Sequence, residues 1–161
     1  MKKSMIIAII VVYIISIVAV NFFGLEMKDF EGLIYATDFE CNIFQRNEDG
    51  EVAIDGTYDD VEKETMYTFT FAGQKGDYTE ETAIDNKINP NIVLIKYRVL
   101  PDNVDNKYIK IRELAPNENY IFDEKGQTIY FINPGLAEFE LSTTDGSNIK
   151  KVIVIRAKRA R

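Results

Sequence analysis

The sequence contains no histidine and no tryptophan, and its only cysteine is Cys41. Without histidine the chain cannot form a Ser–His or Cys–His nucleophilic pair, and it lacks a common zinc ligand. A single cysteine excludes an intramolecular disulfide, and Cys41 alternates with apolar neighbours as a small buried side chain does. No glycine-rich phosphate loop or dinucleotide-binding fingerprint occurs. We therefore expect a protein that is not an enzyme and has no cofactor.

Acidic residues dominate the middle of the chain. All 26 aspartates and glutamates lie between Glu26 and Asp145, and positions 24–148 hold only 11 lysines and arginines, which leaves this stretch with a net charge of −15. An acidic body repels nucleic acid, which proteins bind through basic patches, so we expect no nucleic-acid partner. So many carboxylates leave room for a glycosidase-like pair, and a carboxylate-dependent wall or glycan hydrolase is the least favoured alternative.

Calcium needs separate consideration because three turn-like segments, 47–50, 55–60 and 102–105, are rich in Asp, Asn and Glu. Such oxygen ligands suit calcium, but none of the segments has the twelve-residue spacing of an EF-hand. Turns select the same residues for their own backbone bonds. We therefore expect solvated turns there and no metal site.

The N-terminal segment predicts a membrane anchor. Residues 5–25 carry no charge and are almost all apolar, and a helix of this length, at ~1.5 Å per residue, crosses a ~30 Å hydrocarbon layer. Lys2 and Lys3 precede this stretch and acidic residues follow it, which places the N terminus in the cytoplasm and the C-terminal domain outside. A cleaved signal peptide is the alternative, but the apolar run is long and Ile17-Val18-Ala19 is a weak cleavage site. We expect a stub and signal-anchor helix at 1–25 in a single-pass protein of the cell membrane.

After a short stalk at 26–32, the chain changes to short apolar runs with a period of two. Residues 67–71 alternate aromatic side chains with threonine, and residues 137–141 alternate apolar side chains with glutamate, which predicts strands with one buried face. Residues 92–100 and 149–155 predict longer, more buried strands. Weaker strand candidates are 33–37, 39–45, 52–54, 108–111, 120–122 and 128–132. Turn-forming segments separate these runs, a pattern typical of an all-β sandwich or barrel.

One part of the chain resembles a known family. The predicted strand at 92–100 is followed by Pro101, an Asp/Asn-rich turn and Lys107. The pattern continues with a glycine turn at Gly126, a strand opened by Gly135-Leu136-Ala137, an Asp145-Gly146 hairpin and a last strand rich in valine and isoleucine. This arrangement resembles the bacterial immunoglobulin-like domain, group 2, of invasin- and intimin-type surface proteins. The resemblance covers about residues 85–156, and the tryptophan usual after the lysine is missing.

The resemblance implies an immunoglobulin-like β-sandwich that serves binding or adhesion at a bacterial cell surface. We predict this extracytoplasmic sandwich at 33–156, preceded by the transmembrane helix and followed by a basic tail at 157–161. Residues 33–84 lie outside the resemblance and supply either the first strands of the same sandwich or an additional β-layer. The expected partners are the membrane, through residues 5–25, and an unidentified surface protein, glycan or wall polymer. The alternative function is that of a structural subunit in an envelope membrane complex.

Five residues are candidates for surface contact. Tyr58 and Tyr78 lie in turn-like segments, and tyrosine suits interfaces because it joins an apolar ring to a polar tip. Lys158, Arg159 and Arg161 belong to the basic tail, where each cation near an anionic lipid or polymer surface contributes ~1 kcal/mol. The alternative for the tail is a frayed, solubilising terminus.

Overall fold

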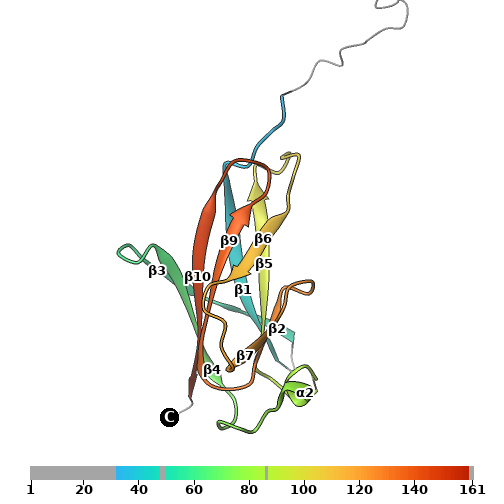
Figure 1. The fold of residues 1–161 in the computed structure, drawn as a ribbon, viewed down its shortest axis with the longest axis vertical. Helices are drawn as coiled ribbons and strands as arrows, with labels where there is room; N and C mark the ends of the chain where they lie inside the picture. The colour runs from blue at the N-terminus through green and yellow to red at the C-terminus, as the bar shows by residue number, and fades with distance from the viewer. Residues whose placement is uncertain (1–31, 48–49, 86, 160–161) are drawn as a thin grey trace, which may run out of the picture. The chain divides into compact units, whose positions relative to one another are not determined.

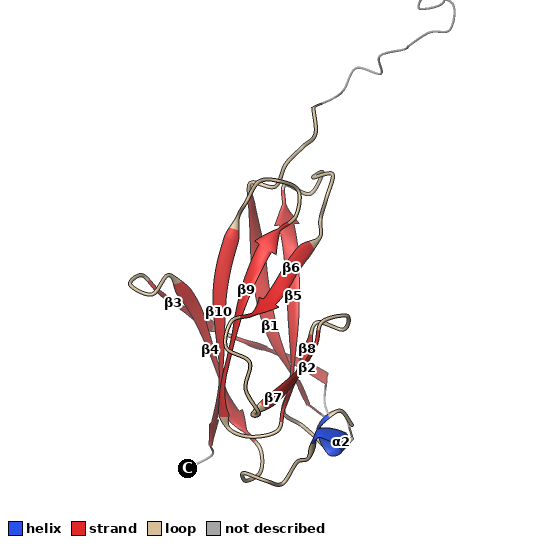
Figure 2. Cartoon of the chain, in the orientation of Figure 1, coloured by secondary structure: helices blue, strands red, loops and turns tan. Residues whose placement is uncertain are grey.

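The computed structural model describes residues 32–47, 50–85 and 87–159. The predicted anchor at 1–25, nearly all of the stalk, and Arg161 lie outside the described residues. Within the described part of the chain, no helix is long and apolar enough to cross a membrane. Its regular structure consists of ten strands and the four-residue helix α2 (Glu80–Ala83) (Figure 2). The predicted all-β class is therefore confirmed.

The strands form two five-stranded sheets that lie face to face as a sandwich (Figure 1). Sheet 1 has the order β2 (Gly50–Ile54), β1 (Asp38–Asn47), β5 (Ile92–Leu100), β8 (Thr128–Phe131) and β7 (Tyr120–Asp123). Sheet 2 has the order β3 (Gly56–Asp59), β4 (Glu64–Phe71), β10 (Lys150–Arg159), β9 (Gly135–Thr143) and β6 (Ile109–Glu113). Neighbouring strands are antiparallel except β4 and β10, which run parallel.

The first four strands belong to the same two sheets as the rest of the chain. β1 and β2 form a hairpin in sheet 1, Asp55 follows, and β3 and β4 form a hairpin in sheet 2. From β5 onward the chain alternates between the sheets, with β6, β9 and β10 in sheet 2 and β7 and β8 in sheet 1. The sequence left open whether residues 33–84 form the first strands of the same sandwich or an additional β-layer. In the structure, their strands belong to the two sheets of the sandwich.

Burial follows the alternation that the sequence predicts. β4 buries its aromatic side chains at 67, 69 and 71, whereas the two threonines between them are exposed. β9 buries its apolar side chains at 137, 139 and 141 in the same way. The ring of Phe139, from sheet 2, lies 4.8 Å from that of Phe122 and 5.8 Å from that of Tyr120, both in sheet 1. Tilted aromatic contacts of this kind stabilise the packing of one sheet on the other.

Two predictions about local structure are wrong. Residues 33–37 form no strand, because Asp105 and Asp145 accept hydrogen bonds from this segment's backbone and replace a neighbouring strand. Residues 55–60 are not only a turn, since β3 lies within them and pairs with β4. A Cβ on Gly56 would come within 2.7 Å of the Tyr67 ring, so glycine allows the close approach that this pairing needs. The remaining weaker candidates overlap β1, β2, β6, β7 and β8.

Candidate functional site

The two ends of β10 mark two ends of the sandwich. β10 runs along the domain from Lys150 to Arg159, and ten strand residues span roughly 30 Å. Ile34 lies beside the loops near the start of β10, and Arg159 lies at the opposite end (Figure 1). We name these the Ile34 end and the basic end.

At the Ile34 end, carboxylates hold the incoming chain. The Asp105 carboxylate accepts a hydrogen bond from the Ile34 N–H at 2.6 Å, and the Asp105 N–H donates back to the Ile34 carbonyl at 3.1 Å. The Asp145 carboxylate accepts the Ala36 N–H at 2.5 Å and two further bonds from Ser147. The bond from Ala36, and then those from Ser147, lower the pKa of Asp145 to about 2. These acids are therefore structural acceptors for backbone donors.

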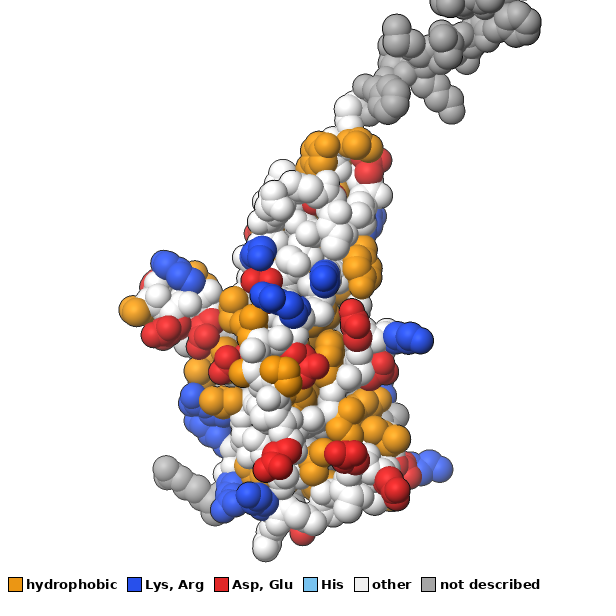
Figure 3. All heavy atoms as spheres, in the orientation of Figure 1, with side chains coloured by type: hydrophobic (Ala, Val, Ile, Leu, Met, Phe, Trp, Pro, Cys, Tyr) orange, Lys and Arg blue, Asp and Glu red, His pale blue; other side chains and the backbone are white. Residues whose placement is uncertain are grey.

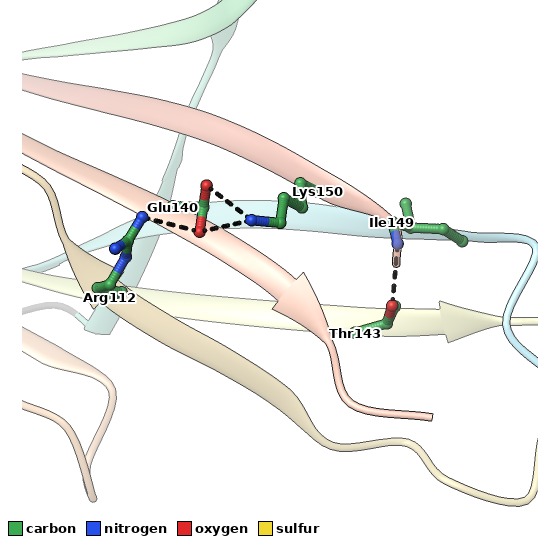
Figure 4. Close-up of polar contacts among 5 residues, drawn as sticks. All are labelled: Arg112, Glu140, Thr143, Ile149 and Lys150. Atoms are coloured by element: carbon green, nitrogen blue, oxygen red, sulfur yellow. Dashed lines mark hydrogen bonds and ion pairs between the residues drawn. The ribbon is translucent and has the colours of Figure 1, made fainter. Parts of the chain in front are cut away.

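Along the sheets, many charged side chains neutralise one another. Glu140 on β9 lies between Arg112 on β6 and Lys150 on β10, at 3.1 and 3.3 Å (Figure 4). Close by, the Ile149 N–H donates to the Thr143 hydroxyl at 3.1 Å, where β9 turns toward β10. Further ion pairs join Arg46 and Lys96 to Glu51, Arg98 to Asp102, and Lys151 to Asp38. These exposed pairs contribute little stability, but they leave few unneutralised cations along the sheets.

At the basic end, three cations lack such partners. Lys158 and Arg159 stand opposite Thr70 and Phe71 where the parallel strands β10 and β4 end together. Lys75 follows in the loop after β4, and none of the three cations forms an ion pair with any residue that the structure describes. One group of Lys and Arg side chains is visible at this end, with Asp and Glu side chains near it (Figure 3).

A polar hollow of about 430 Å³ lies at the basic end, lined by Gly73, Gln74, Lys75 and Arg159. The loop beneath it is held from both sides: the Gln74 N–H donates to the Asp77 carboxylate at 2.6 Å, and the Gly76 N–H donates to the Asn133 side chain at 3.1 Å. Gly73 has a φ of +103°, and a Cβ there would approach the Asp77 carboxylate to 2.9 Å. The loop thus holds Lys75 on a fixed backbone, next to Arg159.

The two candidate tyrosines have different environments. Tyr78 is half-buried, its ring meets that of Phe71 edge-on at 5.8 Å, and its hydroxyl donates to the Ala72 carbonyl at 3.1 Å. Tyr78 therefore supports the loop of the hollow. Tyr58 is 56% exposed on β3, and Val61, in the turn that follows, is 85% exposed. The β3–β4 hairpin stands off the body of the sandwich (Figure 1).

A second hollow of about 380 Å³ lies between β6 and the β7–β8 turn, and Glu124 is the one carboxylate among the described residues that line it. Glycoside hydrolysis generally needs two carboxylates on one cavity. Burial raises the pKa of Cys41 to about 12, so its thiol stays protonated at neutral pH. Among the described residues, no three Cys, Asp or Glu side chains are arranged to hold a metal ion.

The structure brings Arg159 together with Lys75, which the sequence analysis did not single out. Lys158 precedes Arg159 on β10, and its side chain lies on the opposite face of the strand. Gly73-Gln74-Lys75-Gly76 has the composition of a turn, and no local pattern connects it with the C terminus. Only the parallel pairing of β4 with β10 places the two segments side by side. Comparison of the sequence with protein-family models and with curated proteins finds no match.

Proposed function

We propose that this chain is a membrane-anchored bacterial cell-surface protein whose immunoglobulin-like sandwich binds a partner and catalyses no reaction. The observation that carries the proposal is the position of the basic end. The chain enters the sandwich at the Ile34 end, and Lys75, Lys158 and Arg159, which form no ion pair with a described residue, lie at the opposite end of the same domain. The hydrogen bonds that hold the loop at this end use neither Lys75 nor Arg159, so a partner can engage both cations.

The strand order supports an immunoglobulin-like assignment. Constant-type immunoglobulin domains have strands in the order A-B-E-D in one sheet and G-F-C in the other. Here β1-β5-β8-β7 and β10-β9-β6 repeat these two orders, with β2, β3 and β4 added between the first and second strands of the pattern. The resemblance at 85–156 covers β5 through most of β10. This fold by itself carries no chemistry, so the binding role rests on the surfaces.

Protease treatment of intact cells tests the location. We expect external protease to remove the sandwich from cells that express the full chain, because residues 5–25 are proposed to anchor it facing outward. A cytoplasmic marker protein that survives the same treatment is the control. Cleavage that requires permeabilised cells would overturn the proposed location.

Retention on the cell envelope tests the binding role. The full chain in nonionic detergent is mixed with a detergent-washed wall fraction, next to a fusion of residues 1–33 with an unrelated soluble domain. We expect the full chain to sediment with the wall fraction and the fusion to remain in solution. Equal retention of the two proteins would contradict a binding role for the sandwich.

Exchange of the predicted helix tests the structural-subunit alternative. We expect wall retention to persist when residues 1–25 are replaced by an unrelated transmembrane helix, because binding is proposed to lie in the sandwich. Two results together would favour the structural subunit. The chain would show no wall retention with either helix, and a membrane complex that co-purifies with the native chain would be lost after the exchange.

A further inference from the structure

We propose that the hollow between the 73–77 loop and the end of β10 binds phosphate groups of an anionic polymer. This inference rests on the proposed surface-binding function and assigns a ligand class to the basic end. The polymer is identified by its chemistry: repeated phosphates joined in a flexible chain.

The charge of the hollow selects anions. Among the residues that the structure describes, Lys75 and Arg159 line it and no carboxylate does. Arginine presents a planar fork of donors that matches phosphate oxygens, and lysine adds a compact point charge. The nearest acid in the loop, Asp77, accepts a hydrogen bond from the Gln74 N–H, which occupies one of its oxygens. The Gln74 side chain adds a neutral amide to the lining.

Hydrogen bonds hold the loop that forms the hollow, so binding needs little ordering of the backbone. Asp77, Asn133 and the Tyr78 hydroxyl each hold a different point of the loop backbone. These contacts use neutral groups or an acid that faces its own loop, and none of them uses Lys75 or Arg159. The two cations are therefore free for a ligand, on a backbone that is already fixed.

The size of the hollow favours a chain over a single ion. The hollow is open to solvent, and its volume of about 430 Å³ exceeds that of one phosphate ion. One phosphate ion would leave most of it unfilled, whereas a monomer-sized unit with its phosphate fits the usual range of binding pockets.

Titration of the full chain, in nonionic detergent, with fluorescent linear polyphosphate tests the inference. The variant Lys75→Gln with Arg159→Gln removes both cations of the hollow. The control, Lys110→Gln with Lys125→Gln, removes two exposed cations elsewhere, one of them in the hollow beside β6. We expect roughly twenty-fold weaker binding for the first variant, and less than about two-fold for the control. The slope of log affinity against log salt should also fall by about 1 for the first variant.

Equal losses in both variants, or unchanged binding in the first, would overturn the assignment of the site. Polyglutamate, a polymer of carboxylates, tests whether the site prefers phosphate. Equal affinity for polyglutamate and polyphosphate would overturn the ligand class. Tighter binding to separately added anionic-lipid vesicles than to polyphosphate would assign the basic end to membranes instead. Wall retention without polyphosphate binding would refute this inference and leave the proposed function standing, whereas absence of wall retention would refute the function itself.

Discussion

The two ends of the sandwich hold their backbones with different side chains. At the Ile34 end, Asp105 and Asp145 accept backbone N–H groups, so charged side chains carry the structure. At the basic end, the side-chain amides of Asn91 and Asn133 bond to Ala72 and Gly76. Neutral amides hold the backbone there together with the Asp77 carboxylate, which accepts the Gln74 N–H, and these contacts do not use Lys75 or Arg159. Charged side chains that hold the backbone can thus be distinguished from charged side chains that remain available to a ligand.

The largest expected effect comes from the core that supports both ends. Phe139 is fully buried between the sheets, and Phe139→Ala should lower the free energy of unfolding by about 3–5 kcal/mol, since it leaves a cavity. Urea unfolding followed by circular dichroism measures this change. Tyr58→Ala, at an exposed site, is the control and should stay within about 0.5 kcal/mol. A loss below about 1.5 kcal/mol for Phe139→Ala would mean that the two sheets do not depend on this contact.

The next effect tests the neutral amides of the basic end. Asn91 is fully buried, and its side chain accepts from the Ala72 N–H at 2.7 Å and donates to the Ala72 carbonyl at 2.9 Å. Asn91→Ala should cost about 1–3 kcal/mol of unfolding free energy, because both groups lose their partner. Asn103→Ala, at an exposed turn, is the matched control. If the two substitutions cost the same, the amide does not hold this end.

The carboxylates of the Ile34 end should reveal themselves through pH. The pKa of Asp145 falls from an ordinary 3.8 to about 2 in the fold, so its ionised form stabilises the folded state above about pH 4. That contribution is lost as the pH falls toward 2. The urea midpoint of the native chain should exceed that of Asp145→Asn at about pH 7, and the difference should shrink between about pH 4 and pH 2. A difference that is independent of pH would refute this role of the carboxylate.

The smallest effect on stability is expected at the β3–β4 hairpin, which belongs to neither end. Val61→Ser should change the free energy of unfolding by less than about 0.5 kcal/mol, because the side chain is 85% exposed. Val93→Ser, the same substitution at a fully buried position, should cost well over 1 kcal/mol. If Val61→Ser nevertheless weakens wall retention, the hairpin is a second contact surface alongside the basic end.

The sequence predicted much of the fold because β-strands leave a local pattern. Aromatic residues alternating with threonine at 67–71 identify one buried face of β4 without any knowledge of its neighbours. The strand β3 was missed, because Gly56 and Asp59 are poor strand formers and only pairing with β4 makes them extended. The segment at 33–37 was predicted as a strand, since no local signal shows that Asp105 and Asp145 take its hydrogen bonds.

The sequence alone determined the class of the protein: period-two apolar runs require sheets, segregated charge leaves an acidic body with a basic C terminus, and the absence of histidine removes familiar catalytic pairs. The tertiary structure decided which of those charges meet. Lys75 and Arg159 are distant along the chain, and they line one hollow only because β4 and β10 run parallel and end together. Strand pairing is a non-local contact, so the basic end and its hollow exist only in the folded domain.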